Sequence, residues 1–175
     1  MLELTKKADY ALRLMVEIAA STESSLTTSE VARREEIPYQ FLRKVAQGLV
    51  AAGLLTSSRG SHGGLSLAHP AQTISLLEIV RAVDEPAVSR CVIDPAACTR
   101  RNRCVIYPIW RRLQRGMESA MEAVLLSDLA DHHRRVLTAT ARSRSQADDS
   151  PNGPQKRVHK SHFRTPNEIY SRSNS

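Results

Sequence analysis

Three cysteines lie within a stretch of fourteen residues, with the spacing Cys91-x6-Cys98-x5-Cys104, and the chain has no others. The same stretch and its leading edge also carry four arginines: Arg90, Arg100, Arg101 and Arg103. Guanidinium groups nearby favour the thiolate form of cysteine, and thiolates are the ligands of soft metals and iron–sulfur clusters. A cluster usually takes four ligands, so the fourth would come from elsewhere. We expect residues 85–107 to form a loop that binds a two-iron or four-iron cluster.

The same cysteines would also suit a zinc or thiol redox sensor, in which water, Asp9 or His132 would complete a zinc site. A structural use is a third reading, because free cysteines often fill small apolar niches. An enzyme such as a thiol oxidoreductase or electron carrier is disfavoured, since the chain has no CxxC pair and no nucleotide-binding glycine motif. The odd number of cysteines and the lack of a signal-like start predict reduced thiols in a cytoplasmic protein.

Charge is distributed unevenly along the chain. The formal net charge is +7, and the last 35 residues hold 7 Lys or Arg against 3 Asp or Glu. That end has almost no apolar periodicity, so residues 131–175 are expected to be a basic, disordered tail. The tail could add nonspecific attraction to nucleic acid or be a solvated extension. No apolar run approaches the about 20 residues that span a bilayer, which predicts no membrane partner.

The elements before the cysteines read as helix, turn, helix. Thr5 is expected to cap a first helix over residues 5–20, and Thr27 with Glu30 has the capping-box pattern of a second, short helix that ends near residue 35. Ile37-Pro38 separates it from a third helix over about residues 38–52. The first helix has apolar residues at helical spacing that predict one buried stripe: Ala8, Ala11, Leu12, Met15, Ile18 and Ala19.

The third helix has two chemically opposite faces. Its apolar side consists of Phe41, Leu42, Val45 and Leu49. Its other side holds hydrogen-bond donors and no acid: Gln40, Arg43, Lys44 and Gln47. A polar helix face is often only solvated, but a helix-turn-helix protein presents its recognition helix at this position. We therefore expect this face to contact DNA, together with Thr28 and Tyr39.

A hairpin follows the third helix. Gly53 ends that helix, and residues 54–58 and 65–68 read as two short strands around a glycine-rich tip. Arg59 in the tip could enter a narrow minor groove, and Ser61 and His62 are further expected DNA contacts. A plain flexible turn would also explain the glycines. Ser75 and Glu78 form another capping box, for a fourth helix that ends near Asp84. Residues 1–84 are thus expected to be a mainly helical, winged helix-turn-helix domain with a small β-hairpin wing.

A long helix is expected over residues 108–130, opened by Pro108. Apolar residues recur along it in steps of four and three, which is the pattern of a seam between packed helices. Packing within the chain or dimerisation would both explain the pattern. The seam residues are Ile106, Trp110, Leu113, Met117, Ala120 and Val124.

Four blocks in this order resemble the Rrf2 family of bacterial winged-helix regulators. The blocks are LTKKADYALRLMVEIA, then IPYQFLRKVAQGLVAAGLL with the hairpin SSRGSHGGLSLA, then SLLEIVRAVDE, then the three cysteines and a long helix. Many members lack the cysteines, so the chain resembles the cluster-binding branch that includes IscR, NsrR and RirA. The resemblance implies that Cys91, Cys98 and Cys104 are cluster ligands and that residues 108–130 dimerise.

The fourth ligand is open. IscR-like members have a histidine three residues after the last cysteine, where this chain has Tyr107. Asp9 matches the position from which NsrR-like members supply a carboxylate from the opposite subunit. Asp9 could equally pair with Arg13, one turn along the same helix.

The function implied is that of a homodimeric transcriptional repressor on a roughly palindromic DNA operator. The state of its iron–sulfur cluster would report nitric oxide, redox state or iron supply and would change operator affinity. A coupling of about 1 to 3 kcal/mol, roughly 5- to 150-fold in affinity, is enough for such a switch.

Overall fold

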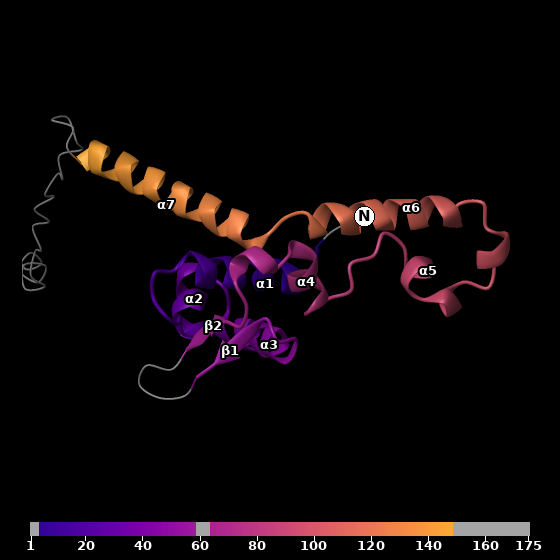
Figure 1. Cartoon of the computed structure of the whole chain (residues 1–175), viewed down its shortest axis with the longest axis horizontal. Helices are drawn as coiled ribbons and strands as arrows, with labels where there is room; N and C mark the ends of the chain where they lie inside the picture. The colour runs from indigo at the N-terminus through magenta and orange to yellow at the C-terminus, as the bar shows by residue number, and fades with distance from the viewer. Residues whose placement is uncertain (1–3, 59–63, 149–175) are drawn as a thin grey trace, which may run out of the picture. The chain divides into compact units, whose positions relative to one another are not determined.

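The computed structural model describes residues 4–58 and 64–148 (Figure 1). The chain divides into one unit of residues 1–138 and a second of residues 139–175. The main elements follow in the order α1 (Lys6–Ala20), α2 (Thr28–Arg34), α3 (Tyr39–Ala51), β1 (Leu55–Ser57), β2 (Leu65–Leu67), α4 (Leu76–Arg81), α5 (Arg90–Ile93), α6 (Tyr107–Glu122) and α7 (Leu126–Asp148). Within the described ranges, no helix has the length and apolar character needed to cross a membrane.

The predicted caps of the first helices are confirmed. The Thr5 hydroxyl accepts a hydrogen bond from the Ala8 amide at 3.3 Å and starts α1. Thr27 and Glu30 form the reciprocal capping box of α2, with the Glu30 carboxylate accepting from the Thr27 amide at 2.8 Å. These hydrogen bonds satisfy amides that a helix start leaves without partners.

The apolar stripe of α1 is wider than the sequence pattern predicted. Leu14 is fully buried although it was outside the predicted stripe, while Leu12 and Ala19 are only half-buried. The reason is that α1 packs against both α3 and α4, so more than one side of this helix faces the core. Ala8, Ala11, Met15 and Ile18 are buried as predicted.

Two backbone positions shape the ends of the helix-turn-helix. Glu36, in the turn between α2 and α3, has a φ of 55°, the left-handed region in which a side chain is strained. Gly53 follows α3 with a φ of 75°, which glycine adopts freely, and so ends the helix as predicted. The turn also carries the buried Ile37, whose amide donates to the Ala32 carbonyl at 2.9 Å.

The wing is a two-stranded antiparallel hairpin, as predicted. Leu55 of β1 pairs with Leu67 of β2, and Ser57 pairs with Leu65. Leu26 adds a further bridge to Leu65, which ties the hairpin to the start of α2. The tip, including Arg59, lies outside the described residues.

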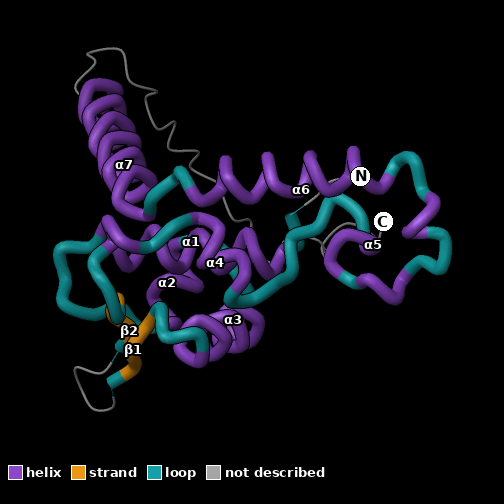
Figure 2. Tube along the Cα trace, turned by 45° about the vertical axis from the view of Figure 1, so that its right-hand side comes forward, coloured by secondary structure: helices purple, strands orange, loops and turns teal. Residues whose placement is uncertain are grey.

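The helices α1, α2, α3 and α4 lie together with the wing (Figure 2). One apolar core joins these elements to Leu126 at the start of α7. Its completely buried side chains come from every one of these elements. They include Leu14, Leu42, Leu49, Leu55, Ile79 and Leu126. The capping box of α4 is formed by Ser75 and Glu78 as predicted. The helix-turn-helix and its wing therefore share the same apolar interior.

The single helix predicted over residues 108–130 is wrong in its boundaries. The structure ends α6 at Glu122 and starts α7 at Leu126. The helix is interrupted between them, where Leu125 forms a β-bridge with Ser75 and the Leu76 amide donates to the Val124 carbonyl at 2.9 Å. Val124 therefore lies outside the helix whose seam it was expected to join.

The disordered tail predicted from residue 131 is also wrong as far as residue 148. α7 runs through this segment. Its first turns are fixed by Leu126 and Ala130, which are 0% and 1% exposed, and the residues that follow include good helix formers such as Ala, Leu and Arg. Residues 149–175 of the predicted tail lie outside the described residues.

Candidate DNA-binding surface and cysteine segment

The polar face predicted for the third helix is exposed on α3. All four side chains of this donor face are exposed: Gln40, Arg43, Lys44 and Gln47. Neither Arg43 nor Lys44 forms a hydrogen bond or ion pair among the described residues. The opposite face is held in the core by Leu42, Val45, Ala46 and Leu49. The core therefore fixes α3 in place, and the exposed donors of α3 are available to a ligand.

Phe41 does not share the buried face to which the sequence pattern assigned it. It is 41% exposed. Its ring packs edge-on against Tyr10 of α1, with ring centroids 5.3 Å apart and planes at 88°. Phe41 thus lies at the border of the core, where it helps to fix α3 to α1.

A pocket lined by hydroxyl groups lies between α2, α3 and the wing. It has a volume of about 280 Å³. Its lining includes the predicted DNA contacts Thr28 and Tyr39, and also hydroxyl residues that the sequence reasoning missed: Thr27, Ser29, Ser57 and Ser58. Gly64 also lines the pocket, and it passes so close to Leu26 that a Cβ at this position would lie 2.9 Å from the Leu26 carbonyl oxygen. The run Thr27-Thr28-Ser29 at the start of α2 was the signal that could have indicated this site.

The other predicted wing contacts, Arg59, Ser61 and His62, lie outside the described residues. The structure therefore brings together Thr28 and Tyr39 at the pocket and the four donors on α3.

The cysteine segment, residues 89–104, consists of short turns. α5 carries Cys91, and two single 3-10 turns, Pro95–Ala97 and Arg101–Arg103, each lead directly into the next cysteine. All three thiols are free and half-buried. The Ser89 hydroxyl lies 3.3 Å from the Cys91 sulfur. In the part of the chain that the structure describes, no three His, Cys, Asp or Glu side chains converge as a metal site.

The cysteine segment fits a thiolate-ligated group by the chemistry of its donors. Three free thiols, each partly accessible to solvent, lie on one short segment whose turns are closed by local backbone hydrogen bonds. Thiolates are soft ligands, and three of them would need one more donor for a four-coordinate centre. The donor set is therefore of the right type, although the three side chains do not converge among the described residues.

Tyr107 is held by arginine side chains. The Arg101 guanidinium carbon lies 4.7 Å from the centroid of the Tyr107 ring, and that of Arg111 lies 6.0 Å away. Both distances are in the range of cation–π contacts. Arg101 Nε is buried without a hydrogen-bond partner among the described residues. The stack ties the last turn before Cys104 to the start of α6.

Asp9 is paired within its own helix. Arg13 Nε lies 3.1 Å from Asp9 Oδ2, in an ion pair that is about half exposed. This is the intrahelical alternative that the sequence left open. His132, the other candidate for a zinc ligand, is exposed on α7 and belongs to no metal-binding group among the described side chains.

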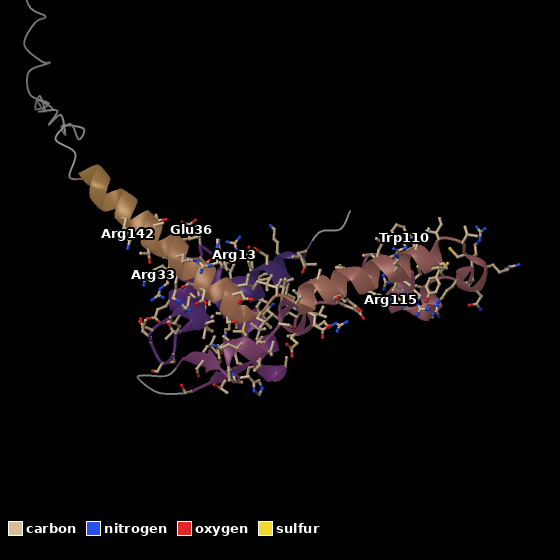
Figure 3. The ribbon with its side chains drawn as sticks, turned by 45° about the horizontal axis from the view of Figure 1, so that its top comes forward. Arg13, Arg33, Glu36, Trp110, Arg115 and Arg142 are labelled. Atoms are coloured by element: carbon tan, nitrogen blue, oxygen red, sulfur yellow. The ribbon has the colours of Figure 1, made fainter. Side chains whose placement is uncertain are left out.

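α6 exposes apolar side chains near the cysteine segment. Ile106, Ile109 and Leu113 are 48%, 56% and 50% exposed. Ile109 was not part of the predicted seam, whereas Trp110 and Met117 are half-buried. Figure 3 labels Trp110 and Arg115 on this helix. A cluster of exposed large apolar residues on one helix is typical of a surface that contacts another protein.

A buried carboxylate network, which the sequence reasoning missed, links α1 and α2 to α7. Glu17 is 8% exposed, and its Oε1 lies 2.7 Å from Nε2 of His133, although the ring N–H is not aligned for a hydrogen bond. Arg34 lies 3.6 Å from the other oxygen of Glu17. Burial and the neighbouring Glu17 carboxylate raise the pKa of Glu35, against the opposing effect of Arg13.

Comparison with known proteins finds one family over most of the chain. The model of the Rrf2 family, described as iron-dependent transcriptional regulators, matches residues 4–132. The Rrf2 protein of Nitratidesulfovibrio vulgaris is 31% identical over 130 residues, which cover 73% of this chain and 87% of that protein. The regulator IscR of Xenorhabdus nematophila is 29% identical over 159 residues, 90% of this chain and 96% of its own.

Solved structures agree. CymR, the global cysteine regulator of B. subtilis, is similar with a TM-score of 0.62 at 25% identity, over 75% of this chain and 98% of that one. IscR of T. potens has a TM-score of 0.63 at 20% identity, over 77% of this chain and 90% of that one, and shows the fold alone. The predicted winged-helix fold is thereby confirmed.

Proposed function

The chain belongs to the Rrf2 family of transcriptional regulators, and we propose from this premise that it is a repressor whose operator affinity is set by an iron–sulfur cluster on its three cysteines. The observation that carries the DNA-binding part is the exposed donor face of α3 beside a hydroxyl-lined pocket. The cysteine part rests on three free, half-buried thiols in one short segment.

The donor face of α3 suits the major groove. Arg43 and Lys44 can donate to guanine edges or to phosphates, and Gln40 and Gln47 can both donate to and accept from base edges. The hydroxyls of Thr28 and Tyr39 suit phosphate oxygens, which fix the register of the protein on the duplex. Arg59 with Ser61 and His62 would extend the contact from the wing into the minor groove.

A second copy of the chain is part of the proposal. The exposed apolar side chains of α6 would be covered by the same helix of a partner, since a twofold interface uses the same surface patch on both subunits. Two recognition helices related by a twofold axis would contact a roughly palindromic operator, with half-sites one or two helical turns apart.

Cys91, Cys98 and Cys104 would hold the cluster, and the donor for a fourth position is Asp9 of the partner subunit or an open site. When bound, the cluster supplies sensitivity to nitric oxide, redox state or iron supply. For Asp9 to serve, its ion pair with Arg13 would have to open, and that pair is exposed enough to open at small cost. The arginines of the segment would offset the negative charge of the thiolates.

The experiment that tests this proposal is anaerobic isolation of the full chain, with iron, sulfide and zinc counted per chain. Iron and sulfide that disappear in Cys98→Ser support the cluster. Colourless protein with one zinc per chain supports the zinc alternative on the same thiols. Protein that takes up neither metal after reconstitution overturns both, and leaves a regulator without a metal centre.

A further inference from the structure

The buried amide of Gln114 joins α6 to the segment that precedes the cysteines. Gln114 is 4% exposed. Its Nε2 donates to the Pro86 carbonyl at 2.9 Å, and its Oε1 accepts from the Val88 amide at 2.9 Å. Both ends of the side-chain amide are therefore used to hold one short stretch of backbone against the helix.

Glu118, one turn further along α6, extends this contact to the winged helix. Its Oε1 accepts from Gln114 Nε2 at 2.9 Å and from Arg81 at 2.8 Å. Arg81 is the last residue of α4. Since Ile79 and Val80 of α4 are completely buried in the core, the position of Arg81 is fixed with that core.

The other end of the contact approaches a cysteine. Val88 is followed directly by Ser89, whose hydroxyl lies 3.3 Å from the Cys91 sulfur. Hydrogen bonds and the backbone of residues 86–89 together thus connect a thiol to α6, and the bonds of Glu118 connect α6 to α4. Among the described residues, Gln114 and Glu118 are the only side chains of α6 that form a hydrogen bond to residues 86–88 or to α4.

We propose that Gln114 and Glu118 are positioning residues that couple the state of the cysteines to operator affinity. This inference rests on the proposed function. A buried amide that loses its partners is destabilised, so residues 86–88 either stay bound to α6 or leave as a unit. An element with two discrete arrangements is what coupling between distant sites requires. A change at Cys91 that displaces residues 86–88 would remove two partners of the Gln114 amide and leave it with Glu118 alone, and so disturb the adjoining contact between Glu118 and Arg81.

The main test compares Glu118→Gln with Glu122→Gln. Both substitutions remove one negative charge from α6, and Glu122 is exposed and forms no side-chain hydrogen bond among the described residues. Operator affinity is measured for each protein after anaerobic reconstitution with ferrous iron and sulfide and again without cluster. We expect the ratio of the two affinities to fall at least about fivefold in Glu118→Gln and to be unchanged in Glu122→Gln, with equal iron and sulfide per chain.

A second test uses the variant Gln114→Met and two measurements that need no cluster. Gln114→Met keeps the volume of the side chain and removes its hydrogen bonds, so the Val88 amide should exchange its hydrogen faster than in the wild type. Coupling is reciprocal, so operator DNA should change the alkylation rate of Cys91 in cluster-free wild type, and this effect should vanish in Gln114→Met.

Different results would contradict the positioning role and the proposed function. If the wild type binds no cluster and operator DNA does not change the alkylation rate of Cys91, the proposed function is wrong. If the wild type shows a ratio of affinities that Glu118→Gln and Gln114→Met both retain, the function stands and the positioning role is wrong. Unchanged exchange of the Val88 amide in Gln114→Met would also contradict it.

Discussion

The winged helix and the cysteine segment are built in opposite ways. From α1 to α4 each helix contributes completely buried apolar side chains, and three of the four helices begin with a side-chain cap. Between residues 84 and 113 none of the described side chains is buried. The first region is held by its own core, whereas the second has thiols and arginines in place of a core. Its final arrangement is therefore expected to depend on a bound group and a partner.

The largest expected effect comes from the core. Leu42→Ala should lower the free energy of unfolding by about 3 kcal/mol, because the completely buried Leu42 would leave a cavity. Cys98→Ser in metal-free protein should change it by less than about 0.5 kcal/mol. Urea denaturation measures both, with Val105→Ala, at 86% exposed, as the control. A loss for Cys98→Ser as large as that for Leu42→Ala would remove the contrast between the two regions.

The donor face of α3 should matter for binding and not for folding. Arg43→Ala and Lys44→Ala should each weaken operator binding by about 1 to 3 kcal/mol, since each loses a contact to a base or a phosphate. Fluorescence anisotropy at two salt concentrations measures the effect, and the slope against salt should fall by about 1 for a phosphate contact. Arg135→Ala, exposed on α7, is the matched control. Full affinity in both α3 variants would exclude this face as the reading surface.

The backbone strain at Glu36, in the turn between α2 and α3, is expected to have a smaller effect on stability. Glu36→Gly should raise the free energy of unfolding by about 1 kcal/mol, because Glu36 has a φ of 55° and glycine has no Cβ to strain there. Ser24→Gly, in an exposed loop without a positive φ, should bring no gain. Thermal denaturation compares the two. A loss of stability in Glu36→Gly would mean that its side chain makes contacts that outweigh the strain.

The smallest effects concern two carboxylates with opposite pKa shifts, Glu30 in the first turn of α2 and Glu35 directly after this helix. Burial raises the pKa of Glu35, so its charged form opposes folding at pH 7, and this cost disappears as pH falls below the ordinary glutamate pKa of 4.5. Hydrogen bonds from Thr27 lower the pKa of Glu30, so its contribution is present above 4.5 and is lost as pH falls through the lowered value. Glu35→Gln should thus stabilise the protein at pH 7, and Glu30→Gln should destabilise it. Both differences should shrink in acid, and denaturation curves from pH 7 to pH 3 would reveal a wrong sign in either.

Local patterns predicted most of the winged helix. The capping box of Thr27 and Glu30 and the helix end at Gly53 depend on residues a few positions apart, so they could be read from the sequence. The break at Val124 could not, because it depends on pairing with Ser75, some fifty residues earlier. The burial of Gln114 was missed for a similar reason: its partners Pro86 and Val88 lie on another segment, and a glutamine on a helix is usually exposed.

The site was predicted by residue type more than by geometry. The donors of α3 were found because their spacing places them on one face. The hydroxyl-lined pocket was only partly found, since its walls come from two helices and the wing. The three cysteines were identified by type and spacing, but their side chains do not converge as a metal site among the described residues.

The central claim is that a group held by the three cysteines controls operator affinity. The most direct measurement is the operator affinity of wild type and of Cys98→Ser, each after anaerobic reconstitution with iron and sulfide and each without. We predict that the two wild-type forms differ at least about fivefold and that the Cys98→Ser forms bind equally, with no iron retained. Equal affinity of iron-loaded and iron-free wild type would contradict the account.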